Sequence, residues 1–377
     1  MQTMKGRYNT ANIMIDTIEE TAKEQIQGFL NHPAFADTYI AVMPDCHAGK
    51  GAVVGFTMKA NQYVIPNIIG VDIGCGMLMA KFLLHEVDLP ALDEAIKRVI
   101  PSGFAVNQTI SASKPTISEV TNVCGMIGIG TEKALKAIGS LGGGNHFIEA
   151  GFDQHHNLVI TIHSGSRNFG KCVATFYQQK AKEGLERYFI RDQYKELEFM
   201  PMDSDDGMNY LHGMAVAQRF ASENRKEMMR RLSMHLRAEP VELIESVHNF
   251  IGDDNVIRKG ATSARSGEKV IIPFNMADGI ALCIGKGSKK YNNSAPHGAG
   301  RILSRTQAKK RLSLDGFTKQ MKVAGVYTTT ACAATLDEAP GAYKPMDLIL
   351  ENIKETVDVI EVIKPVYNFK AGGDQEK

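Results

Sequence analysis

Apolar and polar positions recur along this chain with periods that predict both helices and strands. Residues 16–19 read Asp-Thr-Ile-Glu, a capping-box pattern, and a helical pattern follows them as far as Leu30. The helical period recurs in four further segments, at residues 92–100, 173–197, 211–236 and 346–363. The methionine-rich stripe of 211–236 is typical of a buried helix face rather than of a cofactor site.

Short strands are predicted between these helices. Residues 38–43 and 52–58 flank a turn at Asp45-Cys46-His47, and residues 158–162 form an apolar run that ends at His163. Residues 101–130 are rich in Ser, Thr and Gly, so we expect an irregular loop over a site. No tandem repeat or low-complexity tract divides the chain. The prediction is one α+β domain over residues 1–377, with a central β-rich core surrounded by helices and a metal-centred active-site cleft.

Composition adds little about partners, because the net charge is only +1 and any basic surface must come from local clustering. Six cysteines are scattered without a framework spacing, which favours a reducing compartment and hence the cytoplasm. The first ten residues lack the apolar core of a signal peptide. Asn67 and Asp72 interrupt the longest apolar run, so no association with a membrane is expected.

A glycine-rich stretch, residues 43–77, is the segment around which we expect a site to form. Glycine permits positive φ and close approach of the backbone to a ligand. Asp72 and Cys75 lie on one tight loop, where a carboxylate and a thiol can aim at a common point. The alternative is that Asp72 caps a turn and Cys75 is a small buried hydrophobic residue.

Four histidines each lie in a turn beside glycine, asparagine or serine: His146, His163, His248 and His297. Imidazole suits first-row transition metals and thiolate suits softer ions. One or two divalent ions would therefore suit a set of five candidate ligands: Asp72, Cys75, His146, His163 and His248. Spacing alone leaves open whether these residues converge.

Several segments taken together resemble the RtcB-type RNA ligase family. The matching segments are MPDCHAGKGAVVG, IIGVDIGCGM, SLGGGNHFIEA, TIHSGSRNFG, ESVHNF, IRKGATSARSGE, SAPHGAGRILSR and DEAPGAYKP. They follow the family order from about residue 40 to the C-terminal end. The resemblance implies a GTP- and manganese-dependent enzyme that joins RNA 2′,3′-cyclic phosphate or 3′-phosphate ends to 5′-hydroxyl ends in RNA splicing, including tRNA splicing, or RNA repair.

The resemblance also implies residue roles. One or two manganese ions would be held by Asp72, Cys75, His146, His163 and His248, with Cys75 shared. His297 would be the nucleophile that becomes guanylylated, because a neutral imidazole can attack the α-phosphorus of GTP as pyrophosphate leaves. The remaining nucleotide contacts implied are Asn145, Glu149, Asn275, Gly298, Ala299, Gly300 and Lys370. The RNA or phosphate contacts implied are Arg167, Arg301 and Arg305.

One segment departs from the family pattern Pro-Gly-Ser-Met-Gly-Thr-x-Ser. This chain has Asn275 and Ile280 where the family has serines that contact guanosine. An asparagine side chain can still form a hydrogen bond, whereas isoleucine cannot. The nucleotide preference is therefore less securely implied than the metal site. A thiolate ligand is also unusual for manganese, so that metal rests on the resemblance.

Two other functions stay open. A metal-dependent RNA-end phosphoesterase would need the same metal cluster but neither His297 nor a nucleotide pocket. A non-catalytic RNA-binding protein would use the basic stretch from Arg301 to Arg311, which by itself is more typical of a solvated helix face. The resemblance also implies an archease-like activator as a further partner.

Overall fold

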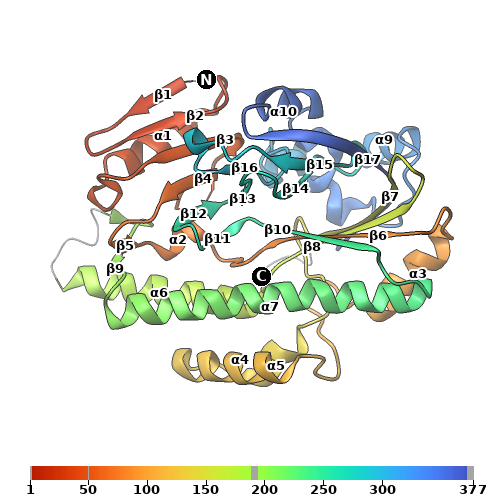
Figure 1. Ribbon diagram of the computed structural model, residues 1–377, viewed down its shortest axis with the longest axis horizontal. Helices are drawn as coiled ribbons and strands as arrows, with labels where there is room; N and C mark the ends of the chain where they lie inside the picture. The colour runs from red at the N-terminus through yellow and green to blue at the C-terminus, as the bar shows by residue number, and fades with distance from the viewer. Residues whose placement is uncertain (1, 50, 188–193, 372–377) are drawn as a thin grey trace.

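Two β-sheets form the centre of the molecule, and the helices pack around them (Figure 1). The computed structural model describes residues 2–49, 51–187 and 194–371. The first sheet has the strand order β1-β2-β3-β4-β12-β11, with only the β2–β3 pair parallel. Its strands are β1 (Gln2–Lys5), β2 (Thr10–Ile13), β3 (Ile40–His47), β4 (Val54–Lys59), β12 (Val256–Lys259) and β11 (Asn249–Ile251).

The second sheet has seven antiparallel strands in the order β10-β6-β8-β7-β17-β15-β14. Its strands are β10 (Glu242–Val247), β6 (Gly76–Phe82), β8 (Leu158–Ser164), β7 (Phe147–Phe152), β17 (Val357–Lys370), β15 (Ile280–Gly285) and β14 (Lys269–Pro273). The backbone N–H of Ile271 on β14 donates to Ser246 Oγ on β10 at 3.1 Å. The two edges therefore meet, and the sheet curls almost into a barrel.

Two short pairs complete the strands: β5 (Tyr63–Val64) with β9 (Met200–Pro201), and β13 (Ala261–Ser263) with β16 (Ser294–Pro296). The α-helices are α1 (Glu20–Leu30), α2 (Pro66–Ile69), α3 (Leu89–Val99), α4 (Lys114–Ile127), α5 (Thr131–Lys136), α6 (Arg167–Glu186), α7 (Asp205–Leu236), α8 (Arg305–Arg311), α9 (Leu314–Val323) and α10 (Met346–Asn352). The 3₁₀ turns are η1 (Pro33–Phe35), η3 (Lys289–Tyr291), η4 (Ala333–Glu338) and η5 (Pro340–Ala342). Among the described residues, no helix is long and apolar enough to span a bilayer.

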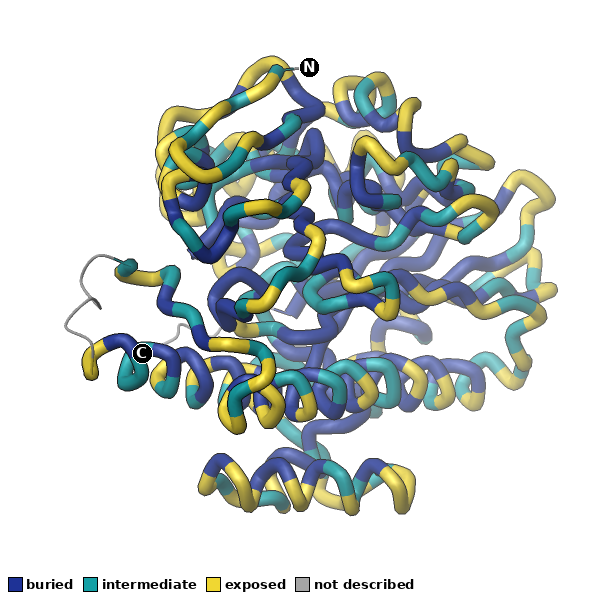
Figure 2. Tube along the Cα trace, turned by 60° about the vertical axis from the view of Figure 1, so that its left-hand side comes forward, coloured by how far each residue is buried: buried dark blue, intermediate teal, exposed yellow. Residues whose placement is uncertain are grey.

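Helix α7 is the long element that runs beneath the sheets in Figure 1, and α4 and α5 lie on its other side. It begins at Ser204, whose Oγ accepts from the N–H of Gly207 at 3.1 Å. The predicted methionine-rich stripe is buried, as the dark inner face of the helix in Figure 2 illustrates. The stripe consists of Met214, Ala217, Phe220, Met228 and Leu232.

Two buried polar residues of α7 reach into the loops that carry the site. Arg225 NH1 donates to the carbonyl oxygens of Gly74 and Ser164 at 2.9 and 2.7 Å, and Arg225 NH2 pairs with Glu245 at 2.8 Å. Asn224 Oδ1 accepts from the N–H groups of residues 139 and 140. Because these carbonyls and amides are buried, α7 replaces the water that would otherwise satisfy them.

The predicted α+β class is confirmed, but three predicted segments are wrong. The expected turn at Asp45-Cys46-His47 is instead the end of strand β3. Residues 101–130 are not one irregular loop, because they contain α4, which starts at the N-cap Ser113. Residues 346–363 are not one helix, because α10 ends at Asn352 and residues 357–370 form β17, paired on both sides with β7 and β15. The predicted helix 173–197 is α6 through Glu186, and residues 188–193 lie outside the described part. The single domain stays a prediction.

Candidate active site and metal centre

A cavity of about 900 Å³ opens where the two sheets approach each other. Its wall includes a histidine–cysteine cluster with His297 beside it. At a separate position the wall includes two buried polar residues, Glu149 and Asn368. Most of the residues predicted for the site line this one cavity: Asp72, Cys75, Asn145, Glu149, His163, His248, Asn275, His297, Gly298, Ala299, Gly300, Arg301, Arg305 and Lys370. The sequence motifs, which are far apart in the chain, therefore converge.

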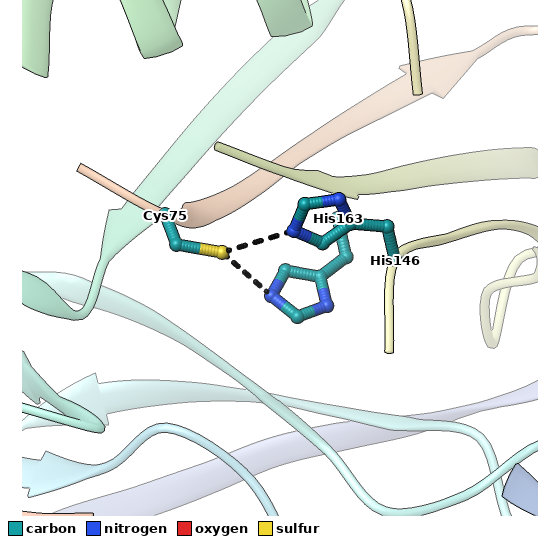
Figure 3. A group of neighbouring side chains, drawn as sticks. All are labelled: Cys75, His146 and His163. Atoms are coloured by element: carbon teal, nitrogen blue, oxygen red, sulfur yellow. Dashed lines mark hydrogen bonds between the residues drawn. The ribbon is translucent and has the colours of Figure 1, made fainter. Parts of the chain in front are cut away.

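Cys75 lies at the centre of the cluster, and the rings of His146 and His163 face its sulfur (Figure 3). The Sγ atom is 3.5 Å from His146 Nε2 and 3.3 Å from His163 Nε2. Cys75 and His146 are the residues just before β6 and β7, and His163 lies at the end of β8. Since β6, β8 and β7 are adjacent strands, their pairing places the three side chains at one end of the sheet.

Two more predicted ligands extend the cluster. Asp72 Oδ2 lies 3.0 Å from His146 Nε2, and His248 Nε2 lies 3.3 Å from His163 Nε2. All five predicted metal residues therefore form one continuous group. Asp72 joins the cluster through His146, and His248 joins it through His163.

Hydrogen bonds at the outer ring nitrogens indicate that a cation suits this group. His146 Nδ1 contacts the carbonyl oxygen of Leu141 at 2.9 Å, and His163 Nδ1 contacts that of Asn145 at 3.1 Å. A carbonyl only accepts, so the proton of each neutral ring lies on Nδ1. Both Nε2 lone pairs then point at the Asp72 carboxylate, at sulfur or at another ring nitrogen. A metal ion bound between them would convert these opposed acceptors into ligands.

The charge states of the cluster fit the same interpretation. Burial lowers the pKa of His163 and of His248, so both rings are neutral near pH 7. Burial and the Asp72 carboxylate raise the pKa of the Cys75 thiol well above its usual range. Without a cation the thiol is protonated, and binding of a metal would release that proton.

His297 lies beside the cluster and is held by a carboxylate. Its Nδ1 donates to Asp45 Oδ2 at 2.7 Å, and its ring centroid is 4.7 Å from that of His248. Asp45 is fully buried. Gly300 permits this arrangement, because it has a φ of 72° and a Cβ there would lie 2.2 Å from the Asp45 carbonyl oxygen. The proton on Nδ1 leaves the Nε2 of a neutral ring with a lone pair.

A third part of the cavity wall combines charged and aromatic side chains. The ammonium of Lys370 lies 2.8 Å from Glu338 Oε2 and stands over the rings of Phe147 and Tyr343, at 5.4 and 5.8 Å from their centroids. Tyr343 also donates its hydroxyl to Glu338. Burial raises the pKa of Glu149 to about 8, although Asn368 and Lys370 act in the opposite direction.

The deciding comparison is with protein families. The family model described as tRNA-splicing ligase RtcB matches residues 25–130 and 126–371. This chain belongs to the RtcB family. The RNA-splicing ligase RtcB of Escherichia coli strain K12 is 31% identical over 391 aligned residues, covering 94% of this chain and 95% of that protein. The tRNA-splicing ligase RtcB of Nanoarchaeum equitans is 28% identical, with 83% of each chain covered. The resemblance seen in the sequence motifs is confirmed.

Some residues that the RtcB resemblance implies have other partners in this chain. Asn275 uses its side chain within its own turn, where Nδ2 donates to Asp278 at 2.7 Å and Oδ1 accepts from two backbone N–H groups. Ile280 packs in the apolar interior of the curled sheet and does not line the cavity. Arg301 pairs with Glu338 at 3.1 Å.

The other two arginines differ in exposure. Arg167 has a φ of 56° and lies against Gly142, where its NH2 donates to the carbonyl oxygen of Gly103 at 2.8 Å. Arg305 is 55% exposed at the cavity mouth, and its Nε is 3.9 Å from an Asp337 oxygen. Arg305 is therefore the more accessible of the two to a ligand.

Several residues of the site were not predicted from the sequence. Phe147 and Tyr343 lie within the RtcB-like segments SLGGGNHFIEA and DEAPGAYKP, so the motifs contained the signal. Glu338 lies in the second of these as well. Asp45 was predicted only to lie in a turn, whereas it is the hydrogen-bond partner of His297. Asn368 had no signal, because its role follows from the pairing of β17 with β7, which brings it opposite Glu149.

Proposed function

We propose that this protein is a GTP-dependent RNA ligase. It would join RNA ends that carry a 2′,3′-cyclic phosphate or 3′-phosphate to ends that carry a 5′-hydroxyl, as part of RNA splicing or repair. Membership of the RtcB family supports this proposal, because the relatives named above are called RNA-splicing or tRNA-splicing ligases. The observation that carries it is the contact between His297 and Asp45 beside the histidine–cysteine cluster.

The contact supports a nucleophilic role for His297. Asp45 holds the ring in the tautomer with its proton on Nδ1, so the Nε2 lone pair is available to attack the α-phosphorus of GTP. A nitrogen–phosphorus bond forms and the bond to pyrophosphate breaks. A 2′,3′-cyclic phosphate must first be opened by water to a 3′-phosphate. The RNA 3′-phosphate then takes the GMP from His297, and attack by the 5′-hydroxyl on the RNA phosphorus forms the new phosphodiester and releases GMP.

The five cluster residues are proposed to hold one or two manganese ions: Asp72, Cys75, His146, His163 and His248. A bound divalent ion would neutralise charge on the phosphate oxygens as it develops during transfer. Asn145 lies at the same wall, and its carbonyl orients His163. The ligand chemistry would also accept zinc, cobalt or iron, so manganese follows from the family.

The rest of the cavity would bind the nucleotide and RNA. Glu149 and Lys370 are proposed to contact guanine, and the backbone of Gly298, Ala299 and Gly300 to approach its phosphates. The exposed Arg305, with Arg167, is proposed to bind RNA phosphates. The free state of all six cysteines fits a cytoplasmic enzyme. An archease-like activator would be a further partner.

Mass spectrometry after incubation with GTP and manganese tests the proposal. We expect one GMP adduct on His297 that is labile to acid and stable to base, as a phosphorus–nitrogen bond should be. His297→Ala should lose both the adduct and RNA joining while retaining metal. His155→Ala, in an exposed hairpin, is the control. Release of phosphate from RNA ends without joining would favour the phosphoesterase alternative.

A further inference from the structure

Two buried oxygen atoms in the cavity wall have no hydrogen-bond partner among the described residues. They are Glu149 Oε1 and Asn368 Oδ1, and their residues are 4% and 2% exposed. Both residues line the cavity. Buried acceptors in folded proteins are almost always paired, so two unpaired ones beside each other indicate a position where a ligand supplies the donors.

The structure fixes how these two side chains sit. Glu149 on β7 and Asn368 on β17 are opposite each other in the strand register. Asn368 Nδ2 donates to Glu149 Oε2 at 2.8 Å, so the donor end of the amide is used within the protein. Its acceptor end is left for a ligand. With the Glu149 carboxyl ionised, the pair therefore presents two adjacent acceptors from two neighbouring strands.

Nearby polar groups do not supply the missing donors. The ammonium of Lys370 is held by Glu338 at 2.8 Å, and the side chain of Asn275 is used within its own turn. Ile280 replaces a hydroxyl with an apolar side chain that packs in the sheet interior. The serine contacts expected for the family are thus absent, while an asparagine occurs on β17.

We propose that Asn368 reads the 2-amino group of guanine. This inference rests on the proposed function, because it takes the cavity to be a guanosine nucleotide site. Guanine carries two neighbouring donors, N1–H and the 2-amino group, which match the two acceptors Glu149 Oε1 and Asn368 Oδ1. Hypoxanthine lacks the 2-amino group and adenine lacks the N1–H. Asn368 therefore determines the preference for guanine over hypoxanthine.

Calorimetric titration with GMP and with IMP, in buffer containing manganese, tests this assignment on the full chain. The native protein should bind GMP at least roughly tenfold more tightly than IMP, the effect of one buried hydrogen bond. Asn368→Val removes the acceptor and suits a strand. Its GMP-to-IMP affinity ratio should fall to about one. Asn368→Asp keeps an acceptor oxygen and should keep the preference for GMP.

A matched control is Asn12→Val, which removes an asparagine amide from β2, outside the cavity wall. It should leave the affinity ratio unchanged. An unchanged ratio in Asn368→Val, equal affinities in the native protein, or a lost preference in Asn368→Asp would each overturn the assignment.

The ligase proposal is tested separately through the adduct on His297. If His297 is labelled but the GMP-to-IMP affinity ratio is the same in Asn368→Val as in the native protein, only the base-reading role is overturned. Loss of the ratio in Asn368→Val, with no adduct in the native protein, would support the base site and overturn the ligase mechanism. Failure to bind either nucleotide would overturn both.

Discussion

Asp45 and His297 are 252 positions apart in the sequence, yet Asp45 Oδ2 accepts a 2.7 Å hydrogen bond from His297 Nδ1. The carboxylate is fully buried, and Gly300 is the residue that lets the two chain segments touch. This contact selects the ring tautomer in which Nε2 is unprotonated. The proposed nucleophile therefore depends on a residue that is distant in the sequence and adjacent in the fold.

Asp45→Asn should keep the shape of this contact but reverse the direction of the hydrogen bond between the two side chains. An amide can donate to Nδ1, which would leave the proton on Nε2 and remove the lone pair. We expect GMP labelling of His297 to slow by about 100-fold or more, which is the scale of losing a positioned acid–base partner. The labelling rate under saturating GTP measures this. Unchanged labelling would show that Asp45 does not set the tautomer.

Cys75→Ala should abolish metal loading and labelling while leaving the fold intact, because the Cys75 sulfur adjoins both His146 and His163. Elemental analysis of the purified variant measures the bound metal. Cys172→Ala is the matched control, since that cysteine is half-buried on α6. Full metal stoichiometry in the Cys75 variant would contradict its place as a ligand.

The affinity for guanine nucleotides should depend on pH through Glu149. Burial raises the pKa of this carboxyl to about 8, so it holds a proton at pH 7. Accepting a hydrogen bond from the base N1–H favours the ionised form, so binding would release the proton. GMP affinity should fall by about tenfold for each pH unit below 8 and level off above it. Glu149→Gln should remove the dependence in the same titrations.

The stability of the N-terminal part should fall in acid because of His32. This ring is buried, its Nδ1 accepts from the N–H of Ala34 at 3.0 Å, and burial lowers its pKa to about 4. In the unfolded chain the pKa is 6.5. The contribution of neutral His32 to the free energy of unfolding is therefore complete above pH 6.5. It is lost as the pH falls toward 4, and the loss is at most about 3 kcal/mol.

Denaturant titrations at pH 7.5 and pH 5 measure this difference. His32→Asn keeps an acceptor for the Ala34 N–H and removes the titrating group. The variant should lose less stability between the two pH values than the native protein does. An equal loss in both would assign the acid sensitivity to other groups.

Arg225→Met should destabilise the protein and loosen the metal site together. The substitution leaves the carbonyls of Gly74 and Ser164 and the Glu245 carboxylate without their donor. Each of the two buried carbonyls left without this donor costs about 1–3 kcal/mol in the free energy of unfolding. Arg219 lies on the same helix as Arg225 and forms a half-exposed ion pair with Glu119 on α4. Arg219→Met should cost less than about 1 kcal/mol in the free energy of unfolding. Similar losses in both variants would contradict the anchoring role.

The sequence predicted which side chains meet at one cavity better than it predicted the secondary structure. Histidines beside glycines mark turns where the backbone must be close to a ligand, and such a signal is local. Strand pairing then brings the turns together, as when β7 and β8 align Phe147 with His163. The partner of His297 could not be found in the same way, because the Asp45 contact depends on how distant segments pack.

Two of the secondary-structure errors have a cause in the local sequence. Residues 357–363 pair with β15 alone, and the neighbouring apolar residues Val359 and Ile360 are both exposed, so apolar side chains do not alternate with polar ones there. Two register shifts along β17 disturb the alternation further. Helix α4 carries β-branched residues and Gly125, which weaken helix propensity, so packing against α6 and α7 decides its form.

The late position of strand β17 in the chain determines when the central sheet can be completed during synthesis. The strand lies in the interior of the seven-stranded sheet, between β7 and β15, and it follows every cluster residue in the chain. A polypeptide still emerging from the ribosome has therefore synthesised all five cluster side chains before it has either Asn368 or Lys370. Premature termination ahead of β17 yields a product that has the metal-binding groups but an open sheet. Such a fragment lacks Asn368 and Lys370 of the proposed nucleotide pocket, so we expect incomplete synthesis to give an inactive chain rather than a partly functional one.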